Sequence, residues 1–440
     1  MIKRFLLVAV TFLLLHIHTK AQSLYFPPIS FTANWDTISP NSLGWCLPEI
    51  DSLYGFLEKE NTKGFMVLKD GKIVLEKYFG NFTKDSVWYW ASAGKTITSF
   101  LIGKAQEENF LKLTDTSSKY LGNGWTNCTL AQENKMSIRN HLTMTTGLDD
   151  GVTDNHCTDK ICLTYKADAG NRWAYHNAPY TLLEKVITAA ISKTINNYTS
   201  TKLSAKTGIN GLWFTNDFDN VFYSKVRNMA RFGLLYQNNC IWNNDTLLYD
   251  TNYINQSINS SQNINLSYGY LWWLNGKTSC MVPETQLVFP FSICPAGPPD
   301  MIAALGKNGQ IINVVPSQNL VFIRMGDMPG TGDVPFTLNN EIWKRLNLVI
   351  CNTSVNESND RNEVVIYPNP TSGKINITNN VSNSTKSFFK LYTIFGEEII
   401  NIALTENNQS IDLRHLKKGI YFSKILTNEK NISTQKIIIR

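Results

Sequence analysis

The chain has 440 residues, which is too long for one ordinary hydrophobic core and predicts two or more domains. Its hydrophobic content of 43% and aromatic content of 12% are typical of packed globular proteins and exclude a largely disordered chain. The net charge of +6 comes from the two ends, and the central part 22–362 is close to neutral, so its charge implies no basic face for nucleic acid.

Residues 1–21 have the pattern of a secretory signal peptide. Lys3 and Arg4 form a basic start, residues 5–17 are an apolar run, and small residues surround a cleavage point after Ala21. The apolar run is too short to span a bilayer, although a membrane anchor is the alternative. No later stretch is long and apolar enough to span a membrane, so we expect an exported, soluble protein without stable membrane insertion.

The segment 22–350 carries strand patterns towards both of its ends. Residues 64–80 and 309–326 each have the pattern of a β-hairpin, the first turning at Asp70-Gly71. Apolar residues at helical spacing predict helices around and between the hairpins, at 47–60, 92–107, 137–144, 179–194, 224–237 and 336–350. This order predicts an α+β domain in which the two ends of the segment build one antiparallel sheet flanked by helices.

The composition changes after residue 350. Residues 351–362 are polar, have no periodic apolar pattern and are predicted to form a linker. Residues 363–440 alternate apolar and polar positions between turn residues, which predicts a small all-β sandwich domain.

The chain has eight cysteines, which an exported protein is free to oxidise. Cys157 and Cys162 could close a small loop, as could Cys280 and Cys294, and the sequence leaves the connectivity open. His156 beside Cys157 hints at a metal ligand, but no second His-Cys cluster completes four ligands. We therefore expect no metal and no cofactor.

Ser92 stands three residues before Lys95 at the start of an apolar helix. Residues i and i+3 share one face of a helix, so the hydroxyl and the amine can meet. The uncharged stretch 96–102 predicts a buried helix, and burial disfavours the charged form of a lysine. A neutral lysine could activate Ser92 as a nucleophile, with NH groups of the first helical turn stabilising an oxyanion.

The Ser-x-x-Lys pattern is weak by itself, since it recurs at Ser387 and Ser433. Both of these lie on predicted strands, where positions i and i+3 point to opposite faces. The alternative for Ser92 is a helix cap with Lys95 reaching out to solvent.

Tyr175, His176 and Asn177 precede the predicted helix at 179–194. A tyrosine beside a cationic lysine is a plausible proton shuttle. Asn177 can donate its NH₂ group to a substrate carbonyl. The Tyr-x-Asn pattern also occurs elsewhere in the chain, so position must discriminate.

A third motif, Lys307-Asn308-Gly309, leads into the second hairpin. Lys307 adds positive charge, and Gly309 would let a substrate approach the backbone. The NH of Gln310 would then be the second oxyanion donor, with the NH of Ser92 as the first. The literal Lys-Thr-Gly at 206–208 precedes a loop-like run and is set aside.

These three motifs, in this order and spacing, resemble the penicillin-recognising serine hydrolases, most closely the class C β-lactamase and D-alanyl-D-alanine peptidase type. Supporting stretches lie at 137–148, 224–236 and 268–275, so the resemblance covers nearly the whole of 45–350. It implies an antiparallel sheet flanked by helices, with an added all-α subdomain and the site in the cleft between them.

The resemblance also implies roles. Ser92 would be the acylated nucleophile, Lys95 and Tyr175 would share base and acid duty, and Asn177 and Lys307 would hold the substrate. Many esterase relatives have histidine where this chain has Lys307, so the lysine favours a substrate with a carboxylate near the scissile bond. Trp272 and Trp273 could line the cleft or could be simple core.

The tail resembles the C-terminal sorting domain of the type IX secretion system of Bacteroidetes. The match is carried by Tyr367-Pro368-Asn369-Pro370 and Gly419-Ile420-Tyr421. It implies type IX secretion machinery as a partner and release to the medium or anchoring at the cell surface. A generic carbohydrate-binding sandwich is the alternative.

Two further readings stay open. The chain could be a catalytically inactive protein that binds cell-wall glycopeptide, or a metal hydrolase. For the favoured reading, a serine hydrolase, the substrate is a small molecule or peptide with an amide or ester bond, and we expect a monomer.

Overall fold

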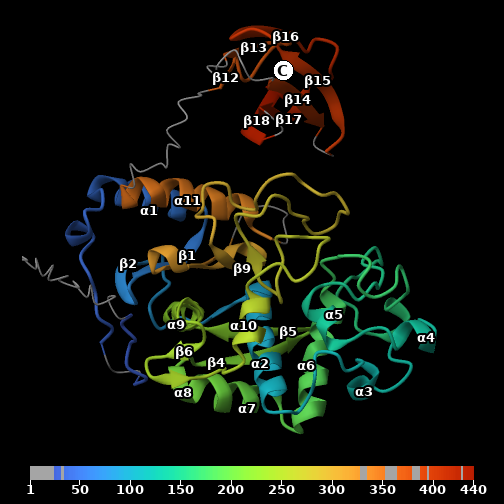
Figure 1. Cartoon of the computed structure of the whole chain (residues 1–440). Helices are drawn as coiled ribbons and strands as arrows, with labels where there is room; N and C mark the ends of the chain where they lie inside the picture. The colour runs from blue at the N-terminus through green and yellow to red at the C-terminus, as the bar shows by residue number, and fades with distance from the viewer. Residues whose placement is uncertain are drawn as a thin grey trace, which may run out of the picture.

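The computed structural model shows an α+β unit followed by a smaller all-β unit (Figure 1). It describes residues 24–30, 34–327, 334–351, 364–378, 387–393, 396–427 and 430–440. The predicted signal peptide at 1–21, and all of the predicted linker at 351–362 except Cys351, lie outside the described residues.

One six-stranded antiparallel sheet organises the larger unit, in the order β2-β1-β11-β10-β9-β8. Both predicted hairpins are present, and the first and last long strands of the unit lie side by side as β1 and β11. The turn of the first hairpin has positive φ at Asp70 (52°) and Gly71 (81°), which suits a tight two-residue connection. The strands are β1 (Thr62–Lys69), β2 (Lys72–Tyr78), β8 (Trp273–Leu274), β9 (Ile302–Gly306), β10 (Gln310–Val315) and β11 (Leu320–Gly326).

Helices cover both faces of this sheet (Figure 1). Helices α1 (Leu47–Lys59) and α11 (Phe336–Ile350) lie together on one face, where Trp343 of α11 contacts Phe322 of β11. Helix α9 (Val226–Gln237) packs on the other face, next to Val321. Because β11 is buried on both faces, all its residues are buried and its sequence is almost continuously apolar.

A mostly helical region lies beside the sheet. Its central helix is α2 (Lys95–Glu107), which follows the 3₁₀ turn η2 (Ala91–Gly94) and packs against α6 (Asn177–Ile191). The other helices of the larger unit are η1 (Pro40–Leu43), α3 (Ser118–Leu121), α4 (Leu130–Glu133), α5 (Ile138–Leu142), η3 (Lys160–Cys162), α7 (Ile195–Thr199), the π-helical η4 (Ser200–Ser204), α8 (Ala205–Thr207), α10 (Thr251–Ser257), η5 (Lys307–Gly309) and η6 (Pro316–Gln318).

Two small sheets complete the larger unit. The strand order β3-β5-β4 joins Trp88–Tyr89, Asp219–Ser224 and Gly211–Asn216, and a two-residue ribbon pairs β6 (Ile241–Trp242) with β7 (Asp245–Thr246). Strand β3 runs directly into η2, so this small sheet anchors the turn that carries Ser92.

The all-β unit has two sheets, β12-β13-β16 and β15-β14-β17-β18, as the alternation of its sequence predicts. Buried residues of both sheets, including Ile375, Phe389 and Ile437, form a core of their own. The strands are β12 (Val365–Tyr367), β13 (Lys374–Thr378), β14 (Ser387–Thr393), β15 (Glu398–Leu404), β16 (Asn408–Asp412), β17 (Gly419–Thr427) and β18 (Lys430–Ile439).

Two disulfides close the larger unit. Cys46 bonds Cys351, with 5.6 Å between their Cα atoms, and so ties the start of α1 to the end of α11. Cys157 bonds Cys162 and closes the short loop that the sequence suggested. Cys280 and Cys294, the other suggested pair, are free buried thiols.

Among the described residues, no helix is long and apolar enough to cross a membrane. Within the same residues, no group of three or more His, Cys, Asp or Glu side chains is placed to hold a metal ion.

Candidate active site

Ser92 and Lys95 lie on consecutive turns where η2 becomes α2. The Nζ of Lys95 donates a hydrogen bond of 2.8 Å to the Oγ of Ser92. Lys95 is only 4% exposed, because α2 runs through the interior and is buried along most of its length. The amine is therefore buried against the hydroxyl and does not extend into solvent.

The Lys95 amine is also fixed by an amide and two aromatic rings. Its Nζ donates to the Oδ1 of Asn177 at 2.9 Å. It stands 4.1 Å from the ring centre of Tyr180 and 5.2 Å from that of Tyr175. Burial raises the pKa of Tyr180 well above its ordinary value, so this phenol stays neutral beside the amine.

Tyr175 is held by a cluster of aromatic side chains. Its ring stacks on Trp273 at 5.6 Å between centres and meets Tyr268 edge to face at 6.3 Å. Trp272 and Trp273 are buried and line no part of the cavity beside Ser92, so of the two alternatives the structure favours core. Trp273 orients Tyr175 from behind.

Asn177 is the first residue of α6 and joins a network that the sequence did not reveal. Its Nδ2 lies 3.2 Å from the Oδ1 of Asn155 and 3.1 Å from the Nε2 of His156. The Nδ1 of His156 in turn lies 2.9 Å from the Oδ1 and 2.7 Å from the Oδ2 of Asp219. Lys95 is thus connected through Asn177 to the loop around 155 and to β5.

A cavity of about 270 Å³ opens in front of Ser92. Lys95, Tyr175, Asn177 and Lys307 line it too, so five of the seven predicted site residues meet in one place. Polar and aromatic side chains complete the wall, among them Tyr89, His156, Tyr180, Asp219, Tyr223 and Asn308. A second cavity of about 670 Å³ shares His156 and Lys307 with the first, so the two adjoin.

Gly309 and Gln310, which the sequence also placed at the site, are not among the residues that line this cavity. Gly309 (φ 80°) faces the buried guanidinium of Arg324, where an added Cβ would come within 2.1 Å of Nη1. The Gln310 side chain is fully buried and donates to the carbonyl of Gly326 at 2.7 Å. Both residues shape the hairpin behind Lys307, because the chain turns away from the site after Asn308.

The glycine that does face Ser92 is Gly306, at the end of β9. A Cβ there would lie 2.5 Å from the carbonyl oxygen of Trp90 and 3.0 Å from the backbone nitrogen of Ser92. The end of β9 is thus packed backbone to backbone against η2. The sequence signal was available, since Gly306 directly precedes the Lys-x-Gly motif.

Family comparisons agree with both units. A family model described as Beta-lactamase matches residues 58–334, which is more than half of the chain. A model described as Secretion system C-terminal sorting domain matches residues 365–440. No curated protein matches the chain.

Solved structures share the fold at low sequence identity. A protein provisionally named a 6-aminohexanoate-dimer hydrolase, from Bacillus anthracis, is 17% identical with a TM-score of 0.55, covering 73% of this chain and 87% of its own. A protein provisionally named a beta-lactamase, from Bacteroides dorei, is 16% identical with a TM-score of 0.55, covering 70% and 99%. An octameric penicillin-binding protein homologue from Pyrococcus abyssi is 14% identical with a TM-score of 0.52, covering 89% and 96%. At these identities the likeness shows the fold alone.

Proposed function

Because the chain belongs to the β-lactamase family of serine hydrolases, we propose that it forms an acyl-enzyme on Ser92 and cleaves an amide or ester bond. Its C-terminal sorting domain marks it for export through the type IX system, to the cell surface or the medium, and so for interaction with that machinery. We propose that an N-terminal signal peptide at 1–21 begins this export.

One observation carries the proposal: the buried Lys95 amine lies 2.8 Å from the Ser92 hydroxyl and is held by Asn177. A neutral amine can keep donating to Asn177 while its lone pair accepts the serine proton. Ser92 Oγ then bonds to the carbonyl carbon, and the carbonyl π electrons move to the oxygen. The three residues of this step, Ser92, Lys95 and Asn177, all line the cavity.

The tetrahedral intermediate formed by this addition then collapses. Its collapse breaks the bond to the leaving group, which takes a proton as it departs. We assign the transfer of this proton to Tyr175 and Lys95, since both line the cavity beside Ser92. Attack by water on the ester of Ser92, with the same groups acting in reverse, releases the acid and restores the hydroxyl.

The developing oxyanion needs backbone donors. The NH of Ser92 is the first donor. The second donor is a backbone NH at the end of β9 near Gly306, in place of the NH of Gln310, because the strand meets the backbone of Ser92 there. Lys307 lines both adjoining cavities and supports recognition of a substrate that carries a carboxylate. β-Lactams, D-amino-acid peptides and small esters all fit this chemistry.

The test is covalent labelling of the intact protein with a fluorescent fluorophosphonate and a fluorescent penicillin. We expect Ser92→Ala to abolish labelling by both probes, while Ser42→Ala, an exposed serine of η1, leaves it unchanged. Turnover of nitrocefin and p-nitrophenyl esters then identifies the substrate class. Labelling that persists in the Ser92 variant, or a folded wild-type protein that neither probe labels, would contradict the proposal.

A further inference from the structure

The amide of Asn177 has one accepting and one donating end, and its neighbours decide which way it points. The Lys95 amine donates 2.9 Å away, so the oxygen of Asn177 must face it. The NH₂ group then faces the Oδ1 of Asn155 at 3.2 Å and the Nε2 of His156 at 3.1 Å. Both of its hydrogens have an acceptor in the protein.

The His156 ring can accept from Asn177 in only one tautomer. Burial acts to raise the pKa of Asp219, but the hydrogen bond with His156 holds this pKa below its ordinary value. Asp219 is therefore a carboxylate and can only accept, so the Nδ1 of His156 carries the proton. The lone pair of Nε2 is left for the NH₂ of Asn177.

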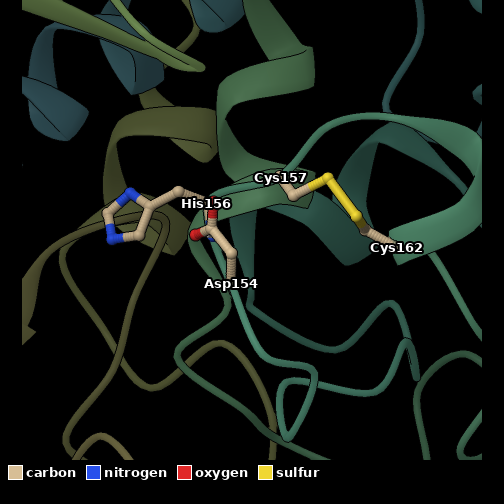
Figure 2. The surroundings of a disulfide bond; sticks show 4 residues. All are labelled: Asp154, His156, Cys157 and Cys162. Carbon is tan, nitrogen blue, oxygen red and sulfur yellow. Dashed lines mark hydrogen bonds between the residues drawn. A yellow bond between two sulfur atoms is a disulfide. The ribbon is translucent and has the colours of Figure 1, made fainter.

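The loop that carries His156 is held by contacts of the residues just before and just after His156 in the sequence. Figure 2 shows Asp154, His156 and the Cys157–Cys162 disulfide on one short loop, with the imidazole pointing away from the disulfide. The backbone NH of His156 donates to the Oδ1 of Asp154 at 2.9 Å. The carbonyl of Asn155 accepts from the NH of Ala178 at 2.9 Å, which joins the loop to the first turn of α6. The ring is thus held firmly beside Asn177.

We infer that His156, oriented by Asp219, is a positioning residue that keeps the oxygen of Asn177 on Lys95. In consequence Asn177 has no free N–H for the substrate, and its place in the reaction is to hold the amine. This inference rests on the proposed acylation of Ser92 and adds a residue pair to it. This role takes the place of the substrate-binding role that the sequence suggested for Asn177.

Two substitutions at one position separate positioning from packing. His156→Phe keeps a ring of similar size and removes both nitrogens, whereas His156→Gln keeps an acceptor near the place of Nε2. We expect the phenylalanine variant to lower the fluorophosphonate acylation rate of Ser92 by about tenfold to hundredfold, and the glutamine variant to recover most of it. His415→Phe, at an exposed position in the sorting domain, is the matched control.

A double-mutant cycle tests whether His156 acts through Asn177. In an Asn177→Leu background, His156→Phe is expected to cause no further loss, since the group that it positions is gone. Losses that multiply in the double variant, or equal losses with phenylalanine and glutamine at 156, would overturn the inference.

A spectroscopic readout keeps the test independent of activity. In ¹⁵N-histidine-labelled wild-type protein, long-range proton–nitrogen correlation should show His156 as the neutral Nδ1–H tautomer, with His156→Gln identifying its signals among the six histidines. An Nε2–H or doubly protonated ring would sink the inference even if Ser92 is acylated. The expected tautomer in a protein that fails to react would instead count against the proposed function alone.

Discussion

Gly306 is a residue at which the central sheet closely approaches the turn that carries Ser92. An alanine there would place its Cβ 2.5 Å from the carbonyl oxygen of Trp90, and backbone atoms cannot move aside as a flexible side chain can. We expect Gly306→Ala to push β9 away from η2 and to lower the acylation rate of Ser92 by at least about tenfold, which corresponds to about 1.4 kcal/mol. Labelling kinetics measure the change.

The matched control is Gly55→Ala on α1, where an added Cβ meets nothing within 4 Å. Alanine favours a helix more than glycine does, so this variant should be as stable as wild type or about 0.5–1 kcal/mol more stable. If Gly306→Ala labels as fast as the control, the close approach of β9 has no part in the chemistry.

His141 makes the stability of the α-helical region depend on pH. It is fully buried, its Nδ1 donates to the carbonyl of Pro179 at 2.6 Å, and burial lowers its pKa from 6.5 to about 4. The unfolded chain therefore binds a proton that the folded protein does not between these values. Stability should be full above about pH 6.5 and fall by roughly 3 kcal/mol as the pH drops towards 4.

Thermal melting between pH 4 and 8 measures this slope, and His141→Gln should flatten it. His176 is also buried with its pKa lowered to about 4, so a residual slope in the variant is expected. A melting temperature of the wild type that does not change between pH 6.5 and 4.5 would contradict the assignment.

At the residue scale, the sequence predicted the contacts that helical spacing determines. Ser92 and Lys95 meet because i and i+3 share a face, while Ser387 begins the same pattern on β14, where the chain is extended. His156 and Asp219 escaped prediction because they meet across 63 residues, one on an irregular loop and the other on a short strand. No periodicity records such a contact.

At the scale of elements, both hairpins and the last helix of the larger unit, α11, could be predicted from alternation, turn residues and apolar spacing. Their boundaries could not: α6 begins at Asn177, since Pro179 suits the first turn of a helix and does not stop it. The small sheet of β3, β4 and β5 was missed, because its strands are short and half exposed and so lack a clear alternation.

The two disulfides are expected to have different effects. One should contribute more to stability, and the other should contribute more to the acylation of Ser92. The Cys157–Cys162 bond closes a loop with a sequence separation of 5, and the Cys46–Cys351 bond one of 305. In the chain-entropy model the short loop contributes about 2 kcal/mol and the long one about 6 kcal/mol. The short loop, however, carries Asn155 and His156 beside Asn177.

We therefore expect Cys157→Ser/Cys162→Ser to slow acylation of Ser92 severalfold with a small loss of melting temperature. The matched pair Cys46→Ser/Cys351→Ser should lower the melting temperature more and leave acylation at 25 °C nearly unchanged. Calorimetry and labelling rates on the two variants decide, and the reverse ranking of the two effects would contradict the prediction.

At the scale of the whole molecule, the composition changes after residue 350, and the residues before and after this point have separate hydrophobic cores. The extent of the helical region beside the sheet was not predictable, because loops of irregular sequence build much of it. That region becomes defined when distant segments such as 149–162 and 219–224 pack around α2 and α6.

The separate core of the sorting domain gives a prediction about function. Because Ile375, Phe389 and Ile437 pack among themselves, removal of residues 352–440 should leave the α+β unit folded. We expect this truncated protein to acylate Ser92 at the wild-type rate but to be retained by cells that export the full chain. Labelling of purified protein and cell fractionation measure the two parts, and loss of labelling on truncation would contradict the first.

The pairing of β1 with β11 has a consequence for the order in which the protein can fold during its synthesis. The two strands are joined by more than half of the chain, so the centre of the sheet stays open on the ribosome until its last strand has been made. Gly306 and the rest of β9 are also synthesised long after Ser92. A growing chain therefore contains Ser92 before its neighbours in the site exist, and the cavity around this serine can form only when nearly all of the first unit has been synthesised.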